Sequence, residues 1–228
     1  MSKRPTVPDF GSVEYWDNRY IEAGARARME WLFPYKDVQG SFESYLGPDK
    51  SAVRVLVLGC GTSTLADDLR QAGFHHVTCI DFSGAAIRCM TSASSPPAVS
   101  STQPPPIQYI QMDVRDLTAF ADNSFDVVID KGVLDCVVCG ISNSVGATRM
   151  LSEVRRVLQA PSGVFFLFST GSYATRVPYI EEASSPPAWH ITPVVLGQPS
   201  HVLALMLRPA DGHPRGTLAV PFTTQAKT

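Results

Sequence analysis

Short runs rich in apolar residues recur through the middle of the chain, and each is followed by a turn and a segment of mixed polarity. The runs occupy residues 53–58, 76–80, 107–111, 125–129 and 164–168. Strands of this length and composition are typical of parallel sheets, which are buried on both faces. The pattern therefore predicts five parallel strands connected by helices.

Segments with helical signals lie before and between these strands. Ser12 is a good N-cap for a helix over residues 13–21, and Glu14 in its first turn complements the helix dipole. A second helix is expected over residues 37–46, ahead of a Gly-Pro stop signal. Further helices are expected over residues 62–72, 83–90 and 146–158.

The C-terminal part has a different pattern. Two apolar runs, 189–196 and 201–207, flank a short loop with glycine and proline, which predicts an antiparallel hairpin. Residues 91–106 are rich in serine and proline, and we expect a flexible surface insertion because this composition buries too little apolar surface to order itself. The prediction is one α/β domain over residues 1–208, with helices on both faces of a mostly parallel sheet, and a weakly ordered tail over 209–228.

Composition narrows the class of protein. With 228 residues and 44% hydrophobic content, the chain can bury a full core, and no stretch approaches the roughly 20 apolar residues of a membrane span. A net charge of −2 gives no basic footprint for nucleic acid. The N-terminus has no apolar signal region, and five cysteines, an odd number, favour reduced thiols. We therefore expect a cytoplasmic protein, monomeric, that binds neither nucleic acid nor membrane.

The first strand ends in a Gly-Cys-Gly turn. Gly59 and Gly61 allow backbone amides to approach a ligand closely, and the following helix favours negative charge near its N-terminus. Asp81 follows the second apolar run and is expected beside that turn, where a carboxylate can accept both hydroxyls of a ribose. These residues predict a site for a nucleotide-like ligand.

Other interpretations of these motifs exist. A Gly-x-Gly turn also joins strands to helices in proteins that bind no ligand. A dinucleotide site would have a third glycine near Thr64, so the threonine favours a smaller nucleoside ligand over NAD. Cys136 and Cys139 have the spacing of half a zinc site, but no second pair lies at a matching distance, and no metal is expected.

Four strings of the chain resemble, in order and spacing, the seven-strand S-adenosylmethionine-dependent methyltransferases; they are residues 58–63, 80–83, 112–114 and 129–135. Within that fold they are similar to a methyltransferase-like group that modifies lysines of elongation factor 1-alpha, and to the related citrate synthase lysine methyltransferase. Residues 11–17 are similar to the elongation-factor branch. Residues 34–40 and the Pro-rich insertion are more similar to the citrate synthase branch. The resemblance implies a Rossmann-like seven-strand methyltransferase fold.

The resemblance also implies roles for residues of the glycine turn and the second strand. Gly59, Cys60 and Gly61 would line the methionine part of S-adenosylmethionine, whose product form is S-adenosylhomocysteine. Asp81 would hold the ribose hydroxyls, with Phe82 beside the adenine.

Further cofactor contacts are implied after the third and fourth strands and before the first. Asp113 and Val114 would recognise the adenine edge, and Lys131 would lie next to the methionine end. Three aromatic residues would close over the cofactor: Trp16, Tyr20 and Trp31. From the residues alone, Asp113 could cap a turn, and Lys131 could be a solvated charge. Trp16 and Tyr20 are four positions apart and could be ordinary core on one helix face.

The reaction expected from this resemblance is attack of a neutral lysine amine on the cofactor methyl group. Asp130 and Asp135 are candidates for steering the incoming ammonium, with Tyr35 or Tyr173 as walls of the channel. From the residues alone, both aspartates could instead be structural. The favoured substrate is elongation factor 1-alpha, with citrate synthase or a small molecule as alternatives. A nicotinamide-dependent oxidoreductase and a non-catalytic binding module are the alternatives from other classes.

Overall fold

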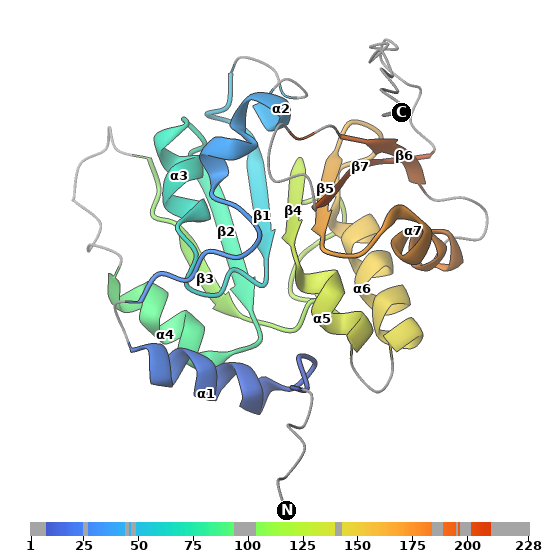
Figure 1. Ribbon diagram of the computed structural model, residues 1–228. Helices are drawn as coiled ribbons and strands as arrows, with labels where there is room; N and C mark the ends of the chain where they lie inside the picture. Colours follow the sequence, from blue (N-terminus) through green and yellow to red (C-terminus); the bar gives the residue numbers. More distant parts are fainter. Residues whose placement is uncertain are drawn as a thin grey trace, which may run out of the picture.

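In the part of the chain that the structure describes, seven strands form one sheet in the order β3-β2-β1-β4-β5-β7-β6 (Figure 1). β3, β2, β1, β4 and β5 are parallel, and β7 and β6 are antiparallel, as the sequence predicts. The strands are β1 (Arg54–Leu58), β2 (His76–Asp81), β3 (Gln108–Gln111), β4 (Val127–Lys131), β5 (Val164–Ser169), β6 (Trp189–Pro193) and β7 (Leu203–Pro209). This computed structural model describes residues 8–24, 27–43, 46, 49–93, 104–139, 143–183, 189–194, 196 and 202–210.

Helices cover both faces of the sheet because side chains alternate in direction along each central strand. In β1, Val55 and Val57 belong to one core cluster and Leu56 and Leu58 to the other, and all four are almost fully buried. The first cluster lies under α3 and the N-terminal segment, and the second lies under α6 and α7 (Figure 1). The helices are α1 (Val13–Ala23), α2 (Gln39–Glu43), α3 (Leu65–Gln71), α4 (Gly84–Ala93), α5 (Val133–Cys139), α6 (Asn143–Val157) and α7 (Tyr173–Glu182), with a short 3-10 helix η1 (Tyr35–Asp37).

The predicted helices are present with shifted boundaries. α1 begins after Ser12, whose hydroxyl accepts the backbone N–H of Tyr15 at 3.4 Å, as expected of an N-cap. The helix expected over 37–46 is present only in part: α2 covers Gln39–Glu43, and the short η1 precedes it with Val38 between the two. Val38 and Phe42 are both buried and belong to the first core cluster.

Two helices are absent from the sequence prediction. α5 has Val-Leu at its start and Val-Val near its end, so apolar residues do not follow helical spacing cleanly. α7 contains Pro178, a residue that usually ends helices, because proline has no N–H to donate. Both helices pack on the second core cluster, so tertiary contacts outweigh their weak local signals.

The serine- and proline-rich insertion is partly helical, because α4 continues to Ala93. Residues 94–103 of the insertion and 211–228 of the tail lie outside the described residues. The expectations of a flexible insertion and a weakly ordered tail therefore stay predictions for these residues. Within the part of the chain that the structure describes, none of the helices has the length and apolar character needed to cross a bilayer.

Candidate functional site

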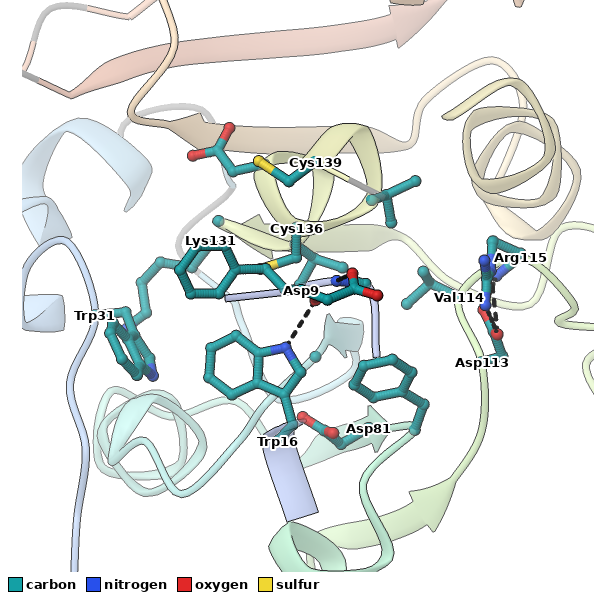
Figure 2. A pocket seen from close by; sticks show the side chains of 18 of the residues that line it. Asp9, Trp16, Trp31, Asp81, Asp113, Val114, Arg115, Lys131, Cys136 and Cys139 are labelled. Atoms are coloured by element: carbon teal, nitrogen blue, oxygen red, sulfur yellow. Dashed lines mark hydrogen bonds and ion pairs between the residues drawn. The ribbon is translucent and has the colours of Figure 1, made fainter. Parts of the chain in front are cut away.

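A cavity of about 520 Å³ opens at the carboxyl ends of the parallel strands (Figure 2). Its walls come from the N-terminal segment, from the ends of β1, β2 and β4, from the loops after β3 and β5, and from α5. This volume is in the range of small-molecule sites, and parallel sheets bind ligands at this edge.

The turn after β1 depends on its two glycines. Gly59 and Gly61 both have φ of +50°, a conformation that glycine adopts without strain. A Cβ on Gly59 would lie 2.4 Å from a methyl carbon of Val133, and a Cβ on Gly61 would lie 2.5 Å from the Tyr20 hydroxyl. Gly59 lines the cavity, whereas the side chain of Cys60 points into the sheet core. The turn therefore presents backbone at the cavity wall.

Asp81 ends β2 beside this turn. Its carboxylate accepts the backbone N–H groups of Gly61 and Ser83, each at 2.8 Å, and it lines the cavity with only 4% of its surface exposed. Burial raises the pKa of Asp81 to about 6, although the two amides favour the ionised form. A carboxylate has about four lone-pair positions, so capacity for two further donors remains after these amides. Phe82 also lines the cavity.

The loop after β3 brings Asp113 and Val114 to the cavity, together with Arg115. Arg115 forms an ion pair with Asp113 at 2.6 Å, and its backbone N–H also donates to this carboxylate at 2.8 Å (Figure 2). Burial acts to raise the pKa of Asp113, but the hydrogen bonds and charge of Arg115 hold it below its ordinary value. Asp113 thus both caps a turn and lines the cavity.

Three aromatic side chains form one wall. Trp16 stacks on Tyr20 with ring centres 5.8 Å apart, and Trp31 meets Trp16 edge-on at 5.6 Å. All three line the cavity, so this is more than ordinary core packing. The indole N–H of Trp16 donates to the carbonyl of Phe10 at 2.8 Å, which holds the residues before α1 against the cavity (Figure 2).

The segment that contains Asp9, Phe10 and Gly11 is a part of the wall that the sequence prediction missed. The one available signal is the position of Phe10, a large apolar residue two places before the Ser12 N-cap. That signal predicts packing against the helix start and says nothing about a cavity.

Lys131 ends β4 and lines the cavity, with 8% of its side chain exposed. Its ammonium pairs with Glu30 at 2.9 Å and donates to the Phe33 carbonyl and the Ser63 hydroxyl, each at 3.3 Å. Burial lowers the pKa of Lys131, against the opposing charge of Glu30. The solvated-charge alternative for Lys131 is therefore wrong.

Asp130, the first candidate for steering an ammonium, instead holds the start of α5. It is fully buried, and its carboxylate accepts the backbone N–H of Val133 at 2.6 Å and of Leu134 at 3.0 Å. These bonds cap the start of α5, and burial raises the pKa of Asp130 to about 7. Asp130 is not in the cavity wall, so its position gives an incoming ammonium no access to the carboxylate.

Asp135 does line the cavity, from the first turn of α5. One oxygen accepts the Ser169 hydroxyl and the Nε–H of Arg176, the latter at 2.9 Å. The other accepts the backbone N–H and the hydroxyl of Thr170, at 2.7 and 2.8 Å. The two suggested channel walls are elsewhere: Tyr35 is buried with its hydroxyl on Glu43, and Tyr173 is half-exposed on α7.

The two cysteines of the Cys-x-x-Cys pair, Cys136 and Cys139, both line the cavity and are free thiols. Within the described ranges, no cluster of three or more histidine, cysteine or acidic side chains could hold a metal ion.

Comparison with known proteins agrees with this geometry. A model of the family described as "Methyltransferase domain" matches residues 56–167. A magnesium protoporphyrin IX methyltransferase from Synechocystis PCC 6803, solved with bound S-adenosylmethionine, has a TM-score of 0.59 at 15% identity and covers 91% of this chain and 100% of its own. An S-adenosylmethionine-dependent methyltransferase from Methanosarcina mazei has a TM-score of 0.57 at 17% identity, over 79% of this chain and 99% of its own. At these identities the structural likeness shows the fold.

Sequence relatives are closer. The human eEF1A lysine and N-terminal methyltransferase is 35% identical over 153 residues, which are 66% of this chain and 20% of the human protein. The chain thus spans about a fifth of the length of that relative. The mouse EEF1A lysine methyltransferase 4 is 33% identical over 185 residues, covering 76% of this chain and 68% of the mouse protein.

The fold, the cavity and these matches define the class: the chain belongs to the S-adenosylmethionine-dependent methyltransferases. Within that class it belongs to the family that includes EEF1A lysine methyltransferase 4.

Proposed function

We propose that the protein is an S-adenosylmethionine-dependent protein-lysine methyltransferase and that elongation factor 1-alpha is its substrate. The observation that carries this proposal is Asp81, a buried carboxylate with capacity for two more donors, placed beside a glycine turn at the wall of a ligand-sized cavity. The substrate part rests on the names of the relatives, which are eEF1A methyltransferases.

The residues of the cavity fit S-adenosylmethionine. Asp81 can accept both ribose hydroxyls, and the backbone at Gly59 has no room for any side chain larger than hydrogen. The aromatic wall of Trp16, Tyr20 and Trp31 suits a sulfonium, because a ring face attracts a cation without acting as a nucleophile. When bound, the cofactor supplies a methyl group on a positively charged sulfur, which takes the electron pair of the broken carbon–sulfur bond.

The chain itself must bring a lysine amine to that methyl group in neutral form. The pKa of a free lysine is about 10.4, so the amine must lose its proton before it attacks. A cavity that excludes water disfavours the charged form, and alignment of the reacting groups supplies much of the rate. In the proposal, the β4 and β5 end of the cavity, with Asp135 and Thr170, performs this function.

We place the reaction in the cytoplasm and treat the enzyme as a monomer. The five cysteines are free thiols, which agrees with a reducing compartment. Citrate synthase lysine and a small molecule remain the alternative acceptors.

The deciding experiment incubates the protein with tritiated S-adenosylmethionine and either elongation factor 1-alpha or citrate synthase. We expect label on a lysine of elongation factor 1-alpha. Label on citrate synthase alone would make citrate synthase the substrate in place of elongation factor 1-alpha. Label on neither protein, with a labelled small-molecule product, would make the protein a small-molecule methyltransferase.

A binding experiment tests the other classes. In a thermal-shift assay, S-adenosylhomocysteine should raise the melting temperature, because a ligand that binds only the folded state stabilises it. Stabilisation by NAD instead would favour a nicotinamide oxidoreductase. Stabilisation by S-adenosylhomocysteine without methyl transfer to any fraction of a cell extract would indicate a binding module.

A further inference from the structure

The β4 and β5 end of the cavity is where the proposal places the acceptor amine, and we call it the acceptor end. The carboxylate of Asp135 at this end already has hydrogen bonds at all of its lone-pair positions. Asp135 receives two hydroxyls, a backbone amide and a guanidinium N–H, two on each oxygen. A carboxylate has about four lone-pair positions, so these four donors fill it. Its charge is paired as well, because Arg176 lies 2.9 Å away and both side chains are largely buried. Asp135 therefore has little capacity left for a substrate ammonium.

Thr170 differs from Asp135 in this respect. It is exposed at the cavity wall, and its hydroxyl donates its hydrogen to Asp135 at 2.8 Å. A hydroxyl has one hydrogen and two lone pairs. With the hydrogen committed to Asp135, the Thr170 oxygen can act toward a ligand only as an acceptor. The backbone N–H of Thr170 donates to the same carboxylate oxygen at 2.7 Å, which fixes the position of the residue.

We propose that the hydroxyl oxygen of Thr170 binds the N–H of the neutral acceptor amine, and that Asp135 and Arg176 act as positioning residues that fix this oxygen as an acceptor. The inference rests on the proposed function, which it deepens by assigning the group that receives the amine. A neutral amine has two N–H bonds and one lone pair, so an N–H bond on Thr170 leaves the lone pair for the methyl group.

A neutral oxygen suits this reaction better than a free carboxylate. A carboxylate beside an amine stabilises the ammonium form and raises its pKa, and an ammonium has no lone pair with which to attack. In the structure, the Asp135 charge is balanced by Arg176, and Thr170, bonded to Asp135, presents an uncharged oxygen at the cavity wall. During transfer, the nitrogen forms its bond to carbon as the carbon–sulfur bond breaks, and the extra proton of the methylated ammonium leaves to solvent.

The contacts around Arg176 explain how the group is held. Its Nε–H donates to both Asp135 and the Ser169 hydroxyl at 2.9 Å. Its guanidinium also packs over Gly171, where a Cβ would lie 2.3 Å from the central carbon. β5, the loop after it and α7 thus fix one carboxylate, and through it one hydroxyl.

The first test compares Thr170→Val with Thr170→Ser. Valine keeps the shape but removes the acceptor, so the kcat for elongation factor 1-alpha should fall about tenfold, the effect of one lost hydrogen bond. Serine keeps the hydroxyl and should keep most of the activity. The affinity for S-adenosylhomocysteine, measured by calorimetry, should be the same in both variants and the wild type. Equal kcat in the valine variant and the wild type would overturn the inference.

The second test separates positioning from direct contact. If Asp135 acts only through Thr170, then Asp135→Asn should lower kcat in the wild type but have little further effect in the Thr170→Val background. Additive losses would mean that Asp135 contacts the amine itself, which would overturn the assignment. If the wild-type protein labels no lysine in the tritium experiment, the proposed function itself is overturned. If it labels a lysine but the Thr170 variants do not behave as stated, only the present inference is overturned.

Discussion

At the β1 to β3 end of the cavity, the carboxylate of Asp81 is held by two donors, whereas at the β4 to β5 end the carboxylate of Asp135 is held by four. Both residues line the same cavity: Asp81 ends β2, and Asp135 lies in the first turn of α5. The donors of Asp81 are neutral amides, but those of Asp135 include Arg176. The two acids therefore differ in how much of their charge and hydrogen-bonding capacity is available to a ligand.

This difference favours ligand binding as the role of Asp81 and positioning of neighbouring groups as the role of Asp135. A buried carboxylate with unused lone pairs is costly until a ligand supplies donors, so Asp81 is arranged to gain from ligand binding. Asp135 is already satisfied and gains little from a ligand. It can instead fix the geometry of its neighbours. The residue type alone does not determine which of these functions an aspartate has.

The largest expected effect tests the Asp81 end. Asp81→Ala removes the acceptor for both ribose hydroxyls, and hydrogen bonds to a charged group are among the strongest, so the affinity for S-adenosylhomocysteine should fall by a hundredfold or more, by an order-of-magnitude estimate. Calorimetry measures this directly. Unchanged affinity would remove Asp81 from the site.

A matched control for this change is Asp135→Ala. It deletes a carboxylate in the same cavity, yet on our interpretation it should leave the affinity for S-adenosylhomocysteine close to that of the wild type. Equal losses of affinity in the two variants would contradict the contrast between binding and positioning.

A second large effect concerns the glycine turn. Gly59→Ala places a residue with a side chain at φ +50° and 2.4 Å from Val133, so it should weaken the binding of S-adenosylhomocysteine and lower stability by about 1 to 3 kcal/mol. Gly40→Ala is the control, since a Cβ there meets nothing within 4 Å and alanine favours a helix. Calorimetry and urea unfolding measure the two effects. A Gly59→Ala protein as stable as Gly40→Ala would contradict this account.

Much of the sheet could be predicted because its strands are locally marked. Apolar runs bounded by glycine and aspartate identify the strands, and the parallel order places Gly59 and Asp81 side by side. α5 and α7 could not be predicted, since their helical form depends on packing against the second core cluster, which no local pattern records.

The acceptor end was less predictable for a related reason. The motif that includes Asp130 and Asp135 marks both aspartates, but it does not show that one is buried as a helix cap and the other bonded to Arg176, which is 41 positions away in the sequence. Thr170 carries no sequence signal of its own. Its role follows only from the hydrogen bonds that the fold creates.

A smaller effect is the pH dependence of cofactor binding. The pKa of Asp81 is raised to about 6, so its carboxyl is largely protonated at pH 5 and ionised at pH 7. Ribose hydroxyls donate best to the ionised form, so the affinity for S-adenosylhomocysteine should rise by about tenfold over this interval, as linkage requires for one proton. Calorimetry at several pH values measures it. Asp81→Asn should bind weakly with no such rise, and a rise that persists there would assign it to another group.

The smallest effect concerns Asp130 and the stability of the fold. Its pKa is raised to about 7 in the folded protein, against about 3.9 for an unfolded aspartate. Between pH 5 and 7 the unfolded state is already ionised while the folded state still holds the proton, so raising the pH removes protons mainly from the folded state and lowers its stability.

Asp130→Asn, which resembles the protonated side chain, should therefore flatten the decline of urea-unfolding stability between pH 5 and 7. The part of this decline in stability that is due to Asp81 should remain, because the pKa of Asp81 is also raised in the folded protein. Asp126→Asn is the matched control: Arg54 holds the pKa of Asp126 below its ordinary value against the effect of burial, so that residue loses its proton below this interval. If Asp130→Asn and the wild type decline in parallel, Asp130 is ionised in the folded protein throughout this interval, and burial does not raise its pKa into it.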